Sequence, residues 1–153
     1  MHSFKVGDIL YRSKLLVQHA GVVVGDNAVL HNSPSGVEIC SLAKYGEGKV
    51  IKVISTNLPE PDKEEFIKRA LELVQEGKKY QLFNFNCEHL VSSIKDLKPT
   101  SSQVTGVAIG SIIAGLYSLS QGSEKTITAM GIGAIGGLLI TNLSRKYDYE
   151  IQS

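Results

Sequence analysis

The sequence predicts an α+β fold, in which helices pack on a small antiparallel sheet and an apolar helical hairpin follows. Short β-branched runs separated by turn residues occupy the first third of the 153-residue chain, and two amphipathic segments come next. Charge then almost disappears, because residues 1–100 carry 25 of the 31 charged side chains. We therefore expect a domain over 1–100, a hydrophobic hairpin over 101–146 and a tail over 147–153.

The expected strands are short and are bounded by glycine, asparagine, proline and serine. Residues 25–27, Gly-Asp-Asn, have the composition of a tight hairpin turn between two of these strands. Residues 12–18 are expected to form a linker and residues 42–48 a loop. The predicted strands cover residues 9–11, 19–24, 28–31, 37–40 and 50–54.

Two helices are expected to complete the domain. Asp62, with Glu65 three residues later, should cap the first helix, and Gly77 should end it. The second helix should begin near Cys87 and end near Lys98. Apolar residues recur at helical spacing in both segments, at Phe66, Ile67, Ala70, Leu71 and Val74 and at Leu90, Val91 and Ile94.

The composition argues against several classes of function. The 16 basic and 15 acidic side chains nearly balance, and no basic run suggests a nucleic-acid partner. Two cysteines form no disulfide framework, and Cys40, in an alternating run, is expected in the core. We expect no metal site and no cofactor, because the His and Cys spacing fits no zinc pattern. Residues 1–8 contain no apolar stretch typical of a signal peptide, so a reducing, cytosolic setting is expected.

Cys87 is the candidate nucleophile. A cysteine in the first turn of a helix meets free backbone N–H groups and the positive end of the helix dipole, and both favour the thiolate. A thiol also needs a base, and the chain supplies His19 and His31 upstream. The alternative is a buried cysteine that packs as a small hydrophobic side chain.

The two histidines are expected to lie at one end of the sheet. His19 begins one predicted strand and His31 ends the next, and residues flanking an antiparallel hairpin lie opposite each other. The alternative is a hydrogen-bonded histidine pair at a sheet edge with no chemical role.

These residues together resemble the lecithin:retinol acyltransferase family, and most closely its H-Ras-like suppressor phospholipase/acyltransferase branch. The resemblance rests on residues 19–26 (His-Ala-Gly-Val-Val-Val-Gly-Asp), His31 and residues 86–89 (Asn-Cys-Glu-His), and it covers roughly residues 5–97. It implies a permuted papain-like fold similar to NlpC-type thiol hydrolases, with histidine before cysteine in the chain. Two departures are Ala20, where relatives often carry an aromatic residue, and a shorter segment before Cys87.

The resemblance also implies roles for the matching positions. Cys87 would form an acyl thioester, His19 would take its proton and His31 would orient His19. The backbone N–H of Cys87 would be a donor to the oxyanion. Glu88 and His89 would support the fold.

Residues 104–119 and 127–143 are almost wholly apolar, and the polar turn between them carries Glu124 and Lys125. Each stretch is slightly shorter than the roughly 20 residues of a standard membrane span. Small residues recur every fourth position, as in closely packed membrane helices: Gly106, Gly110, Ala114 and Ser118, then Ala129, Gly133, Gly137 and Thr141. We expect a membrane hairpin; the alternative is a buried hairpin in a soluble fold.

The charges that flank this hairpin predict its orientation. Lys95, Lys98, Arg145 and Lys146 lie at its outer ends, so both termini should be cytosolic. The leading hypothesis is a membrane-associated thiol acyltransferase or phospholipase A-type hydrolase. It would take a phospholipid as acyl donor and water, an amine or an alcohol as acceptor. The alternatives are an NlpC-type cysteine peptidase or amidase, and a non-catalytic membrane-perturbing or scaffold protein.

Overall fold

The computed structural model describes residues 4–77, 86–96 and 101–153, and it has the expected α+β architecture. The chain divides into two compact units, which we describe separately. The first comprises residues 1–14, 18–100 and 146–153, and the second comprises Leu15–Val17 and Ser101–Arg145. The expected end of the second helix, at Lys98, lies outside the described residues.

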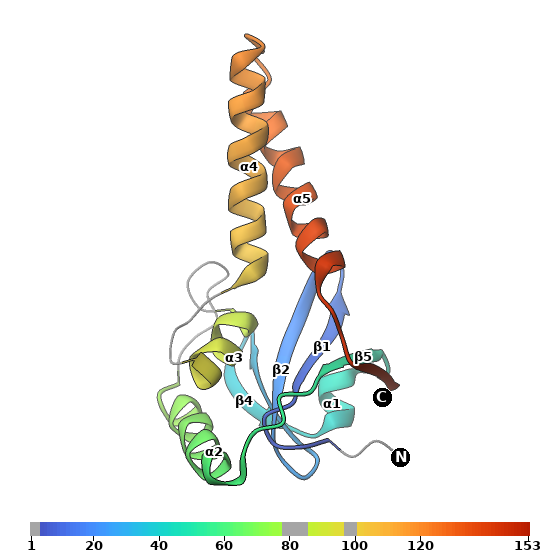
Figure 1. Cartoon of the computed structure of the whole chain (residues 1–153), viewed down its shortest axis with the longest axis vertical. Coiled ribbons are helices and arrows are strands. Elements are labelled where there is room, and N and C mark those ends of the chain that lie inside the picture. The colour runs from blue at the N-terminus through green and yellow to red at the C-terminus, as the bar shows by residue number, and fades with distance from the viewer. Residues whose placement is uncertain (1–3, 78–85, 97–100) are drawn as a thin grey trace. The chain divides into compact units, whose positions relative to one another are not determined.

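A six-stranded sheet with the order β4-β3-β2-β1-β5-β6 forms the centre of the first unit (Figure 1). All five expected strands are present, and the first four are longer than predicted. Residues 12–14, expected in a linker, continue the first strand, because β1 lies between β2 and β5 in the sheet and its pairing with β5 extends to Arg12, opposite Ile51. The strands are β1 (Ile9–Lys14), β2 (Val17–Gly25), β3 (Ala28–Ser33), β4 (Gly36–Cys40), β5 (Val50–Ile54) and β6 (Tyr149–Gln152).

The sixth strand comes from the segment that the sequence analysis treated as a tail. Tyr149–Gln152 pairs with β5 in antiparallel register, with Ile151 opposite Ile51. Four residues are too few to show a strand by their own periodicity, and the pairing partner is about 100 residues away in the chain. The last residues of the chain therefore belong to the fold of the first unit.

Three helices pack with this sheet: α1 (Leu42–Gly46), α2 (Glu60–Gln75) and α3 (Cys87–Asp96). The expectation of a loop over 42–48 was wrong in part, because Ser41 caps a short helix by accepting the N–H of Lys44 at 3.2 Å. Asp62 is not the N-cap of α2; Pro59 occupies that position and Asp62 lies in the first turn. Proline at 59 and 61 explains the earlier start, since its φ angle suits the first turn of a helix.

Hydrophobic side chains fill both faces of the sheet. One cluster joins the sheet to α2 and α3, through Ala20, Val22, Leu30, Phe66, Ala70, Leu90, Val91 and Ile94. The other joins it to α1 and includes Leu10, Val23, Val29, Cys40, Tyr45, Ile51 and Val53, with Tyr149 and Ile151 of β6 partly buried against it. Cys40 lies in the core, as expected.

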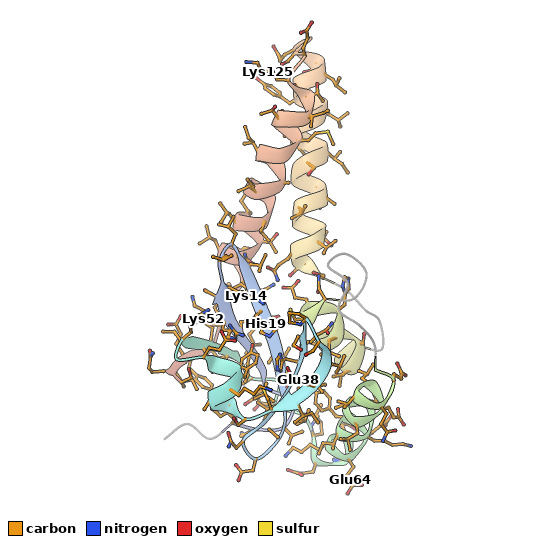
Figure 2. All side chains as sticks on the ribbon, turned by 180° about the vertical axis from the view of Figure 1, so that it is seen from behind. Lys14, His19, Glu38, Lys52, Glu64 and Lys125 are labelled. Carbon is orange, nitrogen blue, oxygen red and sulfur yellow. The ribbon has the colours of Figure 1, made fainter. Side chains whose placement is uncertain are left out.

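The second unit contains a hairpin of two 19-residue helices, α4 (Ser102–Ser120) and α5 (Thr126–Ser144). The glycines of the small-residue stripe bring the two backbones together. A Cβ atom on Gly110 would overlap the carbonyl oxygen of Gly133, and one on Gly137 would overlap that of Gly106. The turn between the helices carries Lys125 (Figure 2).

Most of the large apolar side chains of this hairpin point outward. At about 1.5 Å per residue, each helix is about 28 Å long, close to the hydrocarbon thickness of a bilayer. Both helices are long and apolar enough to cross a membrane, a criterion of length and composition alone. Exposed examples are Ile112, Ile113, Leu116, Leu119, Ile127 and Ile140.

Candidate active site

The hairpin of β2 and β3 brings the two histidines together. His31 lies opposite Gly21, so His19, two residues earlier on the same strand, is the diagonal neighbour of His31. The Nε2 atom of His19 lies 3.1 Å from the Nδ1 atom of His31, and the two ring planes are 84° apart. Both side chains are buried. The expected proximity of the two imidazoles is confirmed.

Helix α3 carries Cys87 to the other side of His19. The Sγ atom of Cys87 lies 3.1 Å from the Nδ1 atom of His19, which confirms the expected contact. Asn86 precedes the helix and its Oδ1 atom accepts the backbone N–H groups of Glu88 and His89, at 3.0 and 3.1 Å. Asn86 thus acts as the N-cap, a role worth about 1 kcal/mol. It places Cys87 at the first helical position.

Glu88 and His89 take part in the structure around this helix end. His89 Nδ1 accepts the backbone N–H of Asn86 at 3.2 Å, which closes the cap from the other side. Both side chains are buried. Their positions agree with a role in supporting the fold.

The charges of the site differ from the expected thiolate. Burial raises the pKa of the Cys87 thiol, although the backbone N–H groups of Ala20 and Cys87 act in the opposite direction. Burial, followed by the positive charge of Arg12, lowers the pKa of His19 to about 3. The helix N-terminus favours the thiolate, but burial favours the neutral thiol and has the larger effect. The resting pair is therefore a neutral thiol beside a neutral imidazole.

Tyr45, on α1, is a site residue that the sequence analysis placed in a loop. Its ring stacks on His19, with centroids 5.5 Å apart, and meets His31 edge-on at 5.6 Å. Its hydroxyl lies 2.8 Å from the carbonyl oxygen of His19 and 2.9 Å from that of Leu10, and the two oxygens share its single proton. A Cβ atom on Gly21 would lie 2.7 Å from the Tyr45 ring, so the absence of a side chain at residue 21 leaves room for the ring beside His19.

Arg12 and Glu47 hold α1 against the sheet. The Arg12 side chain is 5 % exposed, and its guanidinium forms two hydrogen bonds with Glu47, at 3.0 and 2.7 Å. It also lies 5.6 Å from the centre of the Tyr45 ring. Paired in this way, a buried positive charge can stay near the histidines and oppose their protonation.

Glu38 is the second site residue that the sequence analysis missed. It lies on β4 directly opposite His31, and one of its carboxylate oxygens is 3.5 Å from His31 Nε2. Its other oxygen accepts Lys44 Nζ at 3.0 Å. Figure 2 labels both Glu38 and His19. Glu38 follows His31 by seven positions, across a tight turn, and that spacing was the available signal.

The arrangement as a whole is a chain of contacts from a thiol through two imidazoles to a carboxylate. Among residues 4–77, 86–96 and 101–153, no group of three or more His, Cys, Asp or Glu side chains is placed to hold a metal ion. No model of a known protein family and no curated protein sequence matches this chain.

Proposed function

We propose that this protein is a thiol-dependent acyl hydrolase or acyltransferase of the lecithin:retinol acyltransferase type, acting on phospholipid esters at a membrane surface. The observation that carries the proposal is the pair of 3.1 Å contacts that join Cys87 to His19 and His19 to His31. A catalytic triad consists of a nucleophile, a base and an orienting group, joined in this order by hydrogen bonds.

The first half of the reaction forms a thioester. His19 Nδ1 takes the proton of the Cys87 thiol as the sulfur attacks the ester carbonyl carbon. A carbon–sulfur bond forms, the carbon–oxygen bond to the lysophospholipid breaks, and the leaving oxygen takes the proton back from His19. The backbone N–H groups of Ala20 and Cys87, which form hydrogen bonds with the sulfur, are candidate donors to the developing oxyanion.

The second half releases the acyl group. Water, an amine or an alcohol gives its proton to His19 Nδ1 and attacks the thioester carbonyl, and the Cys87 thiol leaves with that proton. The pKa of His19, lowered to about 3, keeps the imidazole neutral and able to accept a proton throughout the neutral range. It also makes His19 a weaker base than one whose pKa lies near the working pH, so the site must stabilise the positive charge that forms on it.

The apolar hairpin supports a lipid substrate. Two helices that could cross a membrane would hold the catalytic unit at the bilayer, with both chain termini on the cytosolic side, and would raise the local concentration of lipid esters.

The proposal also includes a permuted papain-like fold for the first unit. In support, a cysteine begins a helix packed on an antiparallel sheet, and both histidines precede it in the chain.

The test is covalent capture. The purified full-length protein is mixed with phosphatidylcholine vesicles and its intact mass is followed. We expect a gain of one acyl chain, absent in Cys87→Ser and present in Cys40→Ser, which changes the other buried thiol. An adduct from acyl amides or peptides but not from lipid esters would favour the peptidase or amidase alternative. No adduct from either would favour a non-catalytic protein.

A further inference from the structure

We propose that Glu38 is a positioning residue of this site, whose carboxylate fixes the proton of His31 on Nε2 and thereby leaves His19 Nδ1 free to accept the thiol proton. The proposal rests on the thiol function proposed above. Its physical basis is the sequence of ring-nitrogen contacts that begins at Cys87 and ends at Glu38.

The tautomers follow from these contacts. A neutral imidazole has one N–H and one free nitrogen. If His19 is to accept the thiol proton at Nδ1, its own proton must be on Nε2, where it donates to His31 Nδ1. His31 Nδ1 is then the acceptor, so the proton of His31 must be on Nε2. That proton faces Glu38.

The surroundings of His31 leave Glu38 as the acceptor. The Nε2 atom of His31 is buried and has no hydrogen bond to another described residue, while Glu38 Oε1 lies 3.5 Å away. The cross-strand pairing of β3 with β4 holds the two side chains opposite each other. A carboxylate accepts a proton and cannot donate one while ionised, so it selects a single tautomer of its neighbour.

Lys44 keeps Glu38 in the form that this role requires. Its Nζ atom binds the second oxygen of Glu38 at 3.0 Å and holds the pKa of that carboxyl below its ordinary value. Charges that act on His31 come from Arg12 on β1, Glu38 on β4, Lys44 on α1 and Glu47 at the C-cap of α1. Among these charges, Glu38 raises the pKa of His31 the most. Its effect opposes that of burial, which lowers the pKa. Positive charge that forms on His19 during proton transfer is thus stabilised through His31.

Two substitutions separate the hydrogen bond from the charge. Glu38→Gln keeps an oxygen acceptor and removes the charge, whereas Glu38→Ala removes both. We expect the rate of Cys87 acylation by a soluble p-nitrophenyl ester to fall several-fold in Glu38→Gln and about tenfold or more in Glu38→Ala. Glu65→Gln, which breaks an ion pair with Arg69 on α2, is the matched control and should keep the full rate.

The decisive readout is the tautomer itself. The full-length protein, in detergent micelles and with ¹⁵N-labelled histidine, has only four histidines to assign. We expect His31 to carry its proton on Nε2 in the wild type and to become a mixture of Nδ1–H and Nε2–H forms in Glu38→Ala. Glu38→Gln, whose amide can accept or donate, should give a mixture between these two. An unchanged His31 tautomer in Glu38→Ala overturns the proposal, as does a wild-type acylation rate in that variant.

The tautomer is measured before any acylation. Absence of an adduct in the wild type would therefore reject the proposed function, while the spectra would still decide the role of Glu38.

Discussion

The phenol ring of Tyr45 stacks on the imidazole of His19 at an interplanar angle of 26°, while its hydroxyl binds the carbonyl oxygen of the same residue. One side chain thus fixes both the ring and the backbone of the candidate base. Tyr45→Phe should keep the stacking and lose the hydrogen bond. We expect a loss of about 1–3 kcal/mol in the free energy of unfolding, with a several-fold lower acylation rate.

Tyr147→Phe is the control for this prediction. The Tyr147 hydroxyl is buried and has no hydrogen bond to another described residue, so its removal should leave stability and rate nearly unchanged. Thermal melting and acylation by a soluble ester measure the two effects. Equal behaviour of the two variants would show that the Tyr45 hydroxyl does not hold the site.

The acylation rate should be nearly constant between pH 5 and pH 8. The pKa of His19 is lowered to about 3, and that of the Cys87 thiol is raised, so the neutral pair that reacts persists across this range. A histidine with its ordinary pKa near 6.5 would lose activity by about 25-fold between pH 7 and pH 5. A pH–rate profile with a soluble ester measures this, and an acid limb centred near 6.5 would contradict the neutral pair.

Removal of residues 101–145, with a flexible linker of about ten residues between Thr100 and Lys146, should leave a folded and water-soluble unit. A cut at Ser101 that also removes the C-terminus should be less stable, because it deletes β6 and exposes apolar surface of β5. The internal deletion should keep activity on soluble esters and lose activity on vesicle lipids. Flotation with vesicles and thermal melting test this. A full-length protein that stays in the aqueous fraction, together with an unfolded deletion, would reject the anchor.

Acid should destabilise the first unit through His19. In the folded state its pKa is about 3, against about 6.5 unfolded. The unfolded chain therefore binds more protons between these values, so stability is complete above pH 6.5 and is lost as the pH falls toward 3. At pH 5, we expect His19 to lower the unfolding free energy by about 2 kcal/mol. Urea unfolding at pH 7 and pH 5 should show this difference, and His19→Gln should reduce it.

Close contact between the two apolar helices should depend on particular glycines. Gly110→Leu places a side chain against the backbone of Gly133 and should lower the temperature at which the helical hairpin melts in detergent micelles. Gly136→Leu is the matched control, because a Cβ atom on Gly136 has no neighbour within 4 Å. Circular dichroism compares the two. Equal melting temperatures would show that the stripe does not hold the helices together.

The elements of this protein with a strong local signal were predictable. Strands 19–24 and 28–31, the helix that starts at Cys87 and the two apolar helices all follow from periodicity and turn composition. The approach of His19 to His31 also follows, because a tight hairpin places its strand ends together. The contact with Cys87 was expected from the resemblance of the motifs rather than from spacing.

Tertiary packing decided the rest, because the deciding contacts join residues far apart in the chain. Tyr45 reaches His19 and Leu10 from a short helix with little hydrophobic periodicity, and β6 pairs with β5 across about 100 residues. The charge state of Cys87 was also decided by packing. A helix N-terminus favours a thiolate, but burial against the sheet removes the water that would stabilise the charge, and that loss is the larger effect.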